Sequence, residues 1–137
     1  MTRTVVLDNE TVQALGDVAH PKHRRVLSHV QVVAQLKRRA IDITVVVPTA
    51  VRVEAGWDRT AARWALANRL PIRDEPLGTA QANAAAAIRI PSGVSVPDSH
   101  MGAVIRSAAP GQVTVLASDR KDARTVAGTK GVTIVVI

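Results

Sequence analysis

The sequence contains no cysteine, phenylalanine or tyrosine, and two tryptophans are its only large aromatic residues. Without cysteine there is no disulfide framework and no thiolate zinc site. The shortage of rings also excludes nucleic-acid binding by rows of stacked aromatic side chains, because only Trp57 and Trp64 could stack on bases. An RNA or DNA partner would have to be held through its phosphates, by lysine and arginine side chains.

Long apolar segments are also missing. No apolar run approaches the ~20 residues that cross a bilayer. Asp8 follows the N-terminal apolar run too closely for a secretory signal. Together with the lack of cysteine, these absences lead us to expect a cytoplasmic protein that does not associate with membranes.

Acidic residues are few, since 11 Asp and Glu stand against 18 Lys and Arg and give a formal net charge of +7. That sign favours a polyanionic partner such as RNA or DNA without specifying one. Of the 137 residues, 47% are hydrophobic and 21% are charged, which is too apolar a composition for a disordered chain. We expect residues 1–137 to form one packed domain.

Short β-branched runs alternate with helical segments along the chain. The predicted strands are residues 4–7, 43–47, 112–117 and 132–136, with a short strand at Ile72. Two predicted helices begin near Thr11 and near Pro97. The other predicted helices cover residues 21–39, 49–56, 58–70, 78–90 and 120–127, and loops are predicted at 91–93 and 110–111. This alternation predicts an α/β fold, in which a mostly parallel sheet has helices on both faces.

Four acidic residues stand out by their positions. Asp8 and Asp119 come directly after predicted strands, and functional groups gather just beyond the carboxyl ends of strands in open parallel sheets. Glu54 and Asp98 stand in largely apolar segments, where a carboxylate is costly to bury unless it finds a cation or a donor. The positions favour one shared acidic site.

Each of these acids also has a purely structural interpretation. Asp8, Asp98 and Asp119 could cap helices, and Glu54 could form a surface ion pair with Arg52 or Arg59. Four acids together favour a site, because converging carboxylates do not all stay ionised unless a cation holds them. Mg²⁺ and Mn²⁺ prefer carboxylate oxygens and can activate a water for in-line attack on a phosphodiester. The hypothesis is metal-dependent phosphodiester hydrolysis.

The ordered motifs resemble those of PIN-domain ribonucleases, and more closely those of the VapC-type toxins of bacterial toxin–antitoxin modules. They are Val-Val-Leu-Asp8, Val-Pro-Thr-Ala-Val-Arg-Val-Glu54, Val-Pro-Asp98-Ser-His-Met-Gly-Ala-Val-Ile and Val-Leu-Ala-Ser-Asp119. No single motif is specific, but their order and spacing cover residues 5–136.

This resemblance implies a three-layer α/β/α sandwich and a metal-dependent endoribonuclease. It implies that Mg²⁺ or Mn²⁺ binds at the four acids, Asp8, Glu54, Asp98 and Asp119. It further implies a structured RNA substrate such as tRNA or rRNA, a cognate antitoxin that blocks the acidic site, and a homodimer. The alternative is a catalytically inactive PIN-like module that binds RNA or a protein.

The chain departs from the family pattern near the first and last acids. Family members often carry small hydroxyl residues just after the first acid, where this chain has Asn9 and Glu10. Glu10 is therefore an additional candidate ligand. Near the last acid the hydroxyl is at Ser118, a candidate to hydrogen-bond within the site. Asp122 is either a fifth acid or an exposed partner of a neighbouring basic residue, and we favour the exposed position.

The remaining candidates are weaker. His20 and His23 lack further zinc ligands nearby and are predicted at the surface, and His100 is expected to point away from Asp98. Trp57 and Trp64 are assigned to the core or a dimer interface.

Basic residues gather in two stretches. The first stretch lies on the second predicted helix and comprises Lys22, Arg24, Arg25, Lys37, Arg38 and Arg39. It has two interpretations: a rim that faces RNA, or an ordinary solvated helix face. Arg120, Lys121 and Arg124 follow Asp119 and could hold phosphates.

Three other function classes lack their motifs. The sequence has neither a phosphate-binding P-loop nor a Gly-x-Ser-x-Gly elbow. A phospho-acceptor receiver domain is excluded because the strand at residues 43–47 runs into Pro48 instead of an acceptor aspartate.

Overall fold

A central parallel sheet organises the chain. The computed structural model describes residues 2–109 and 111–137, and in them five strands form a sheet in the order β3-β2-β1-β4-β5. The strands are β1 (Thr2–Leu7), β2 (Ile43–Pro48), β3 (Ile72–Glu75), β4 (Gly111–Ala117) and β5 (Thr133–Val136). Every neighbouring pair is parallel, so the predicted parallel sheet is confirmed.

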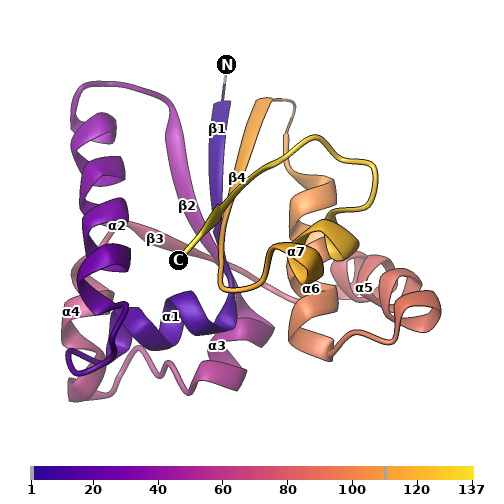
Figure 1. The fold of residues 1–137 in the computed structure, drawn as a ribbon, viewed down its shortest axis with the longest axis horizontal. Helices are drawn as coiled ribbons and strands as arrows, with labels where there is room; N and C mark the ends of the chain where they lie inside the picture. Colours follow the sequence, from indigo (N-terminus) through magenta and orange to yellow (C-terminus); the bar gives the residue numbers. More distant parts are fainter. Residues whose placement is uncertain (1, 110) are drawn as a thin grey trace.

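Helices cover both faces of this sheet (Figure 1). Those that precede β3 are α1 (Asn9–Gly16), α2 (His23–Arg38), α3 (Thr49–Ala55), the 3₁₀ turn η1 (Ala62–Trp64) and α4 (Ala65–Arg69). Those that follow it are α5 (Thr79–Ser92), α6 (Val96–Ser107) and α7 (Arg120–Ala127). The chain moves outward from β1 to β3 and then crosses to β4 and β5, so right-handed crossovers put α2 and α6 on opposite faces. The result is the expected three-layer α/β/α sandwich.

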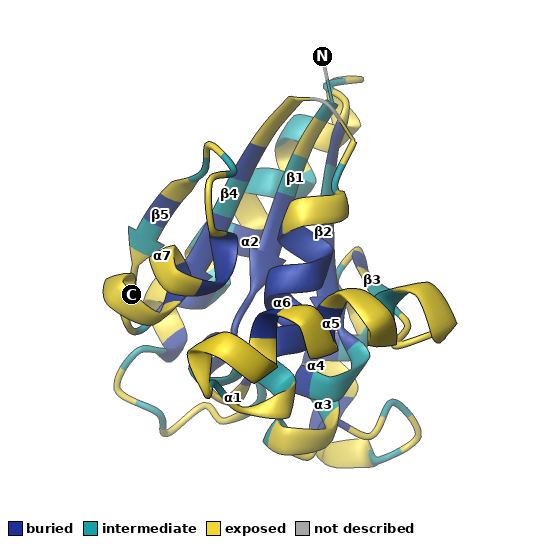
Figure 2. Ribbon diagram, turned by 90° about the vertical axis from the view of Figure 1, so that its right-hand side faces the viewer, coloured by how far each residue is buried: buried dark blue, intermediate teal, exposed yellow. Residues whose placement is uncertain are grey.

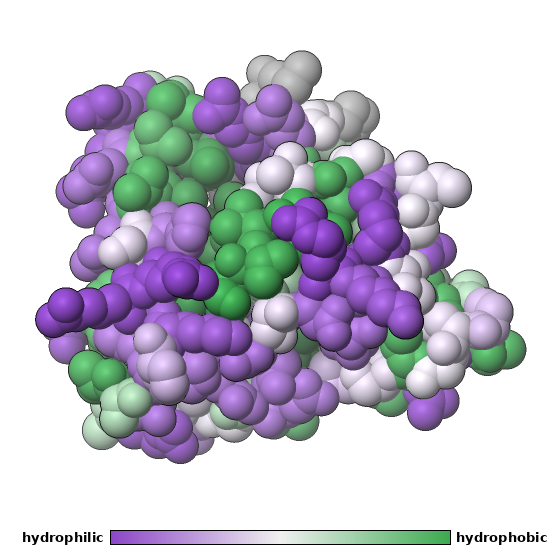
Figure 3. Space-filling model, viewed as in Figure 1, coloured by the Kyte–Doolittle hydropathy of each residue, from purple (hydrophilic) through white to green (hydrophobic). Residues whose placement is uncertain are grey.

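The core consists of aliphatic strands between these helix layers (Figure 2). Val6, Leu7, Val47 and Val115 are fully buried, as expected for central strands that helices cover on both faces. A face-on view shows apolar surface over the middle of the molecule, near β5 and the C-terminus, with hydrophilic residues on either side (Figure 3).

Two stacked tryptophans extend the core toward α4. The rings of Trp57 and Trp64 lie 5.6 Å apart between centroids, and both residues are buried, which confirms their assignment to the core. The ring of Trp64 packs against Gly16 at the end of α1. A side chain at Gly16 would occupy the volume of that ring.

The helix predicted over residues 58–70 is wrong in its first half. The Asp58 carboxylate accepts hydrogen bonds from both the amide and the hydroxyl of Thr60, and Ala61 is extended. These local bonds compete with helix formation, as is typical of aspartate and threonine in turns. Helical structure therefore begins only at Ala62.

Two further helix boundaries differ from the prediction. α2 begins at His23 and not at Pro21, because Asp17 and His20 accept backbone hydrogen bonds that form turns before the helix. α5 continues through Pro91, which was predicted to lie in a loop, and ends at Gly93 in the left-handed conformation. Pro91 has no amide hydrogen to donate, but the Gly93 amide closes the last turn by donating to the Arg89 carbonyl.

The predicted turn at Pro110–Gly111 is only partly visible. Pro110 lies outside the described residues, and Gly111 opens β4 with a φ of +150°.

None of the helices in residues 2–109 and 111–137 combines the length and apolar character needed to cross a membrane.

Candidate acidic active site

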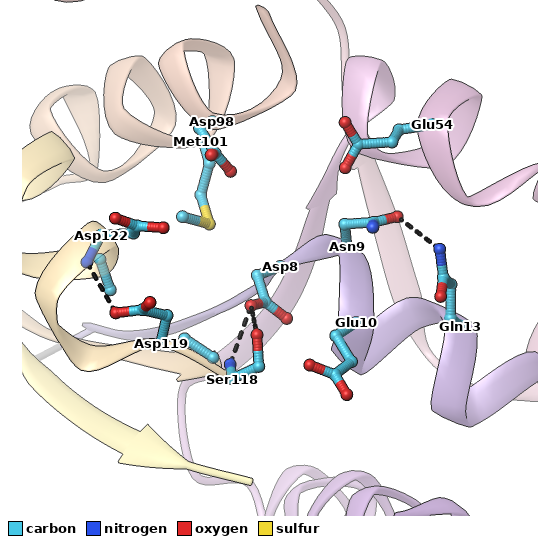
Figure 4. A pocket seen from close by; sticks show the side chains of 12 residues that line it. Asp8, Asn9, Glu10, Gln13, Glu54, Asp98, Met101, Ser118, Asp119 and Asp122 are labelled. Atoms are coloured by element: carbon cyan, nitrogen blue, oxygen red, sulfur yellow. Dashed lines mark hydrogen bonds between the residues drawn. The ribbon is translucent and has the colours of Figure 1, made fainter. Parts of the chain in front are cut away.

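A pocket of about 320 Å³ lies at the carboxyl ends of β1 and β4 (Figure 4). Its lining comes from four places in the chain: Asp8, Asn9, Glu10 and Gln13 after β1, Glu54 on α3, Asp98 and Met101 on α6, and Ala117, Ser118, Asp119, Asp122 and Ala123 at and after the end of β4. All four predicted site residues line it, together with Glu10 and Asp122. No lysine or arginine of the described chain is among its lining residues.

Asp8 forms the base of the pocket. It is buried at the end of β1, and its Oδ1 accepts hydrogen bonds from the Thr11 amide at 2.8 Å and the Thr11 hydroxyl at 2.6 Å. Its Oδ2 accepts from the Ser118 amide at 2.9 Å and the Ser118 hydroxyl at 3.3 Å. The carboxylate is thus held from two sides, by the first turn of α1 and by the end of β4.

Thr11 is the site residue that the sequence analysis missed. The family pattern has a hydroxyl residue just after the first acid, and this chain lacks one at positions 9 and 10. Thr11 supplies that hydroxyl instead, because the first turn of the helix places its side chain beside Asp8. Its oxygen also lies 2.8 Å from the carbonyl of Leu116 on β4. The Asp-x-x-Thr spacing at a helix start is the signal that could have identified it.

Asp119 and Asp122 form the α7 side of the pocket. Asp119 caps α7, and its Oδ1 accepts a hydrogen bond from the Asp122 amide at 3.1 Å. Asp122 is exposed, as predicted, but it faces the acidic pocket, and no ion pair to Arg120 or Lys121 occurs among the described residues. Arg124 was expected near phosphates, but its guanidinium donates to the carbonyls of Gly128 and Lys130 at the end of α7.

Asp98 lies in the first turn of α6, which Ser95 caps by accepting a hydrogen bond from the Asp98 amide. Burial raises the pKa of the Asp98 carboxyl, and a hydrogen bond with Ser95 opposes this only in part. The neighbouring carboxylates Asp122, Asp8 and Asp119 raise the same pKa further. Asp98 therefore experiences the negative charge of the pocket.

Glu54 faces the pocket from α3, on the side opposite Asp119 (Figure 4). Burial, and then the charges of Asp98 and Asp8, raise the pKa of its carboxyl. The alternative ion pair of Glu54 with Arg52 or Arg59 is not formed. Both arginines bind Asp74 instead, at 2.8 and 2.9 Å.

The structural interpretation of Asp8 and Asp119 as helix caps also holds. Capping uses Oδ1 of each carboxylate, and in Asp119 this leaves the second oxygen for other partners. For Asp8 the second oxygen already binds Ser118. A cap and a metal ligand are therefore compatible roles for Asp119, whereas a cation at Asp8 would share an oxygen that already accepts hydrogen bonds from Thr11 or Ser118.

The carboxylates suit a divalent cation by their chemistry but do not form a closed cage. In residues 2–109 and 111–137, no group of three or more His, Asp or Glu side chains stands close enough to hold a metal ion. Six acidic side chains nevertheless line one pocket. A hard cation would relieve the repulsion that raises the pKa of Asp98 and of Glu54. Binding would require side-chain rotations that bring the carboxylates together.

The histidines lie outside the pocket lining. His23 was predicted at the surface, but it is buried, with Nδ1 at 2.7 Å from the Ala14 carbonyl, so that prediction is wrong. His100 is buried, and its Nδ1 lies 3.3 Å from the Ala50 amide. Burial lowers the pKa of His100.

Comparison with known proteins gives no independent assignment: no protein-family model matches the chain, and no curated protein matches its sequence significantly.

Proposed function

We propose that the protein is a cytoplasmic, metal-dependent endoribonuclease, the toxin component of a bacterial type II toxin–antitoxin module. The observation that carries the proposal is the gathering of six carboxylates in one pocket of a chain whose net charge is +7. Local negative charge in a basic chain suits a site that binds a cation while the surrounding surface attracts RNA. The resemblance to VapC-type toxins supplies the toxin assignment.

Asp8, Asp98 and Asp119 would hold Mg²⁺ or Mn²⁺, with Glu54 on the opposite wall. When bound, the metal supplies Lewis-acid chemistry at the scissile phosphate and lowers the pKa of a water. Thr11 and Ser118 keep the Asp8 carboxylate in one orientation. Glu54 lines the pocket, and its raised pKa makes it a suitable acceptor for the proton of the attacking water.

An apolar groove beside the pocket supports a protein partner such as the cognate antitoxin. The groove measures about 540 Å³ and shares Glu54 with the acidic pocket. Three of its lining side chains are exposed, Val53 at 82%, Val96 at 50% and Leu77 at 38%. Exposed apolar side chains that converge on one groove are typical of protein-binding surfaces.

Cleavage of total RNA by the purified protein tests the enzymatic part of the proposal. We expect cleavage of structured RNA, tRNA or rRNA, with Mg²⁺ or Mn²⁺, and none with a chelator. Asp8→Asn and Asp98→Asn should abolish it, whereas Asp17→Asn, an exposed acid outside the pocket, should cleave normally. Metal-independent cleavage, or full activity of the two pocket variants, would contradict the proposal.

A second candidate is a catalytically inactive PIN-like module that binds RNA or a protein. The observation that favours it is the lack of a preformed metal cage in the described chain. Calorimetric titration separates the two candidates, because an inactive module would bind neither Mg²⁺ nor Mn²⁺ at millimolar concentration. Growth arrest on expression, relieved by the product of a neighbouring antitoxin gene, would support the toxin assignment. Light scattering tests the expected homodimer separately, by measuring the molar mass of the protein in solution.

A further inference from the structure

Glu10 differs from the other acids of the pocket because it has a basic partner. Its Oε1 accepts a hydrogen bond from the Lys22 ammonium at 3.0 Å, and His20 Nε2 lies 3.9 Å from the same oxygen. In Figure 4 its carboxylate lies below that of Asp8, whereas Asp98 and Glu54 lie above it. Glu10 thus belongs to the rim of the pocket.

The turn before α2 fixes this partner in place. The Lys22 amide donates to His20 Nδ1 at 3.0 Å, and the Lys22 carbonyl accepts from the Val26 amide at 3.0 Å. Because Nδ1 is an acceptor, a neutral His20 carries its proton on Nε2, the atom that faces Glu10. Only 32% of the Lys22 side chain is exposed, so the ammonium approaches Glu10 from an ordered, partly buried position.

The neighbouring hydroxyl reinforces the arrangement. The Lys22 hydrogen bond is the largest cause that holds the pKa of Glu10 below its ordinary value, followed by a hydrogen bond with Ser118. The Ser118 amide donates to Asp8, and the single proton of the Ser118 hydroxyl is available to either carboxylate. The Lys22 ammonium thus holds the Glu10 carboxylate away from the position where Asp8, Asp98 and Asp119 face one another.

We propose that Lys22 is a positioning residue that keeps Glu10 at the rim, so that a divalent cation binds to Asp8, Asp98 and Asp119 without Glu10. The inference rests on the proposed function, because it concerns the same cation. Loss of the Lys22 ammonium would release Glu10, whose flexible side chain could then turn toward the pocket. Lys22 would thereby limit how much negative charge surrounds the metal.

Mn²⁺ binding measured by isothermal titration calorimetry tests this role without any activity assay. Lys22→Met keeps an unbranched side chain of similar length and removes its charge, and it should tighten Mn²⁺ binding about five- to tenfold. In the Glu10→Gln background the same substitution should have little effect, because no carboxylate remains to be released. Lys22→Arg should keep the wild-type affinity. Arg25→Met removes an equal charge from an exposed position three residues along α2 and serves as the matched control.

Three results would overturn the inference while leaving the proposed function intact. They are an unchanged affinity in Lys22→Met, an equal change in Arg25→Met, and an equal change of Lys22→Met in the Glu10→Gln background. The last two would show that only net charge matters. A wild-type protein that binds no Mn²⁺ at millimolar concentration would instead contradict the proposed function, and this inference with it.

Discussion

At the scale of single residues, hydroxyl groups determine how the acidic pocket is held together. The Thr11 hydroxyl is fully buried between the Asp8 carboxylate and the Leu116 carbonyl, and it has one proton for two acceptors. Ser118 reaches the other oxygen of Asp8 from the end of β4. The orientation of Asp8, a proposed metal ligand, therefore depends on Thr11 and Ser118, which are not proposed as ligands themselves.

Replacement of Thr11 by valine keeps its shape and removes this hydrogen bond. We expect Thr11→Val to lower the free energy of unfolding by about 1–2 kcal/mol, because a buried acceptor loses its donor. Mn²⁺ binding should weaken about 10- to 100-fold, as is usual when a residue that orients a ligand is lost. Urea denaturation and calorimetry measure the two effects. Thr125→Val is the control, since the exposed Thr125 hydroxyl donates to the Lys121 carbonyl within α7. An effect of the same size in both variants would contradict the role of Thr11.

Asp98 provides a prediction about pH. Its pKa is raised in the folded protein, so the folded state binds more protons than the unfolded state at pH values between the unfolded and the folded pKa. Stability falls as pH rises through that interval, and the ionised carboxylate destabilises the metal-free protein at neutral pH. Asp98→Asn should therefore melt at a higher temperature than wild type at pH 7 without metal. The difference should disappear at a pH below both pKa values.

Added Mn²⁺ should reverse the order of these two proteins. It should raise the melting temperature of the wild type and have little effect on Asp98→Asn, because the variant lacks a ligand. A variant that melts lower than wild type at pH 7 in the absence of metal would show that Asp98 contributes structural hydrogen bonds that outweigh the repulsion.

At the scale of elements, the sequence patterns predicted strands better than helix boundaries. Each predicted strand formed, and Asp8 and Asp119 met because the carboxyl ends of parallel strands share one edge. Glu54 and Asp98 reach the same pocket from helices, α3 and the first turn of α6. Helix starts were misplaced where side chains bond locally to the backbone, as at Asp58. The Lys22–Glu10 pair was not foreseen, since it depends on a contact between segments that only the folded chain brings together. Thr11 was missed although its local spacing from Asp8 indicates the contact; only its approach to Leu116 is long-range.

Gly16 shows how closely two elements approach. A Cβ atom at this position would overlap the six-membered ring of Trp64, which is fully buried and cannot move aside. Gly16→Ala should lower the free energy of unfolding by about 1–3 kcal/mol through overpacking. Gly131→Ala is the matched control, because no atom of the described chain lies within 4 Å of the place that its Cβ would take. Equal stabilities of the two variants in urea denaturation would contradict the close packing of α1 on Trp64.

At the scale of the whole molecule, the basic residues divide into two groups along α2. The helix begins beside Glu10 at the pocket rim and runs along the sheet to its other end (Figure 1). Its 16 residues span roughly 24 Å at 1.5 Å per residue. Arg24 and Arg25 therefore lie near the pocket, and Arg38 and Arg39 lie far from it.

This separation decides between the two interpretations of the basic helix. If it is an RNA-facing rim, Arg24→Met with Arg25→Met should weaken RNA binding in chelator more than Arg38→Met with Arg39→Met. Binding should also depend on salt, because few aromatic rings are present to stack on bases. For about four phosphate contacts the affinity should fall roughly 100-fold between 50 and 200 mM salt. Filter binding checks both points, and equal effects of the two pairs would favour an ordinary solvated helix face.

The pairing of β1 with β4 has a consequence for synthesis of the protein. Asp8 directly follows the first strand, but its partner Ser118 and the carbonyl of Leu116 that accepts from the Asp8 amide come more than a hundred residues later. The ribosome releases the N-terminal strands first. The base of the acidic pocket therefore cannot form until β4 has emerged, so a nascent chain remains without an assembled site while most of it is still being translated.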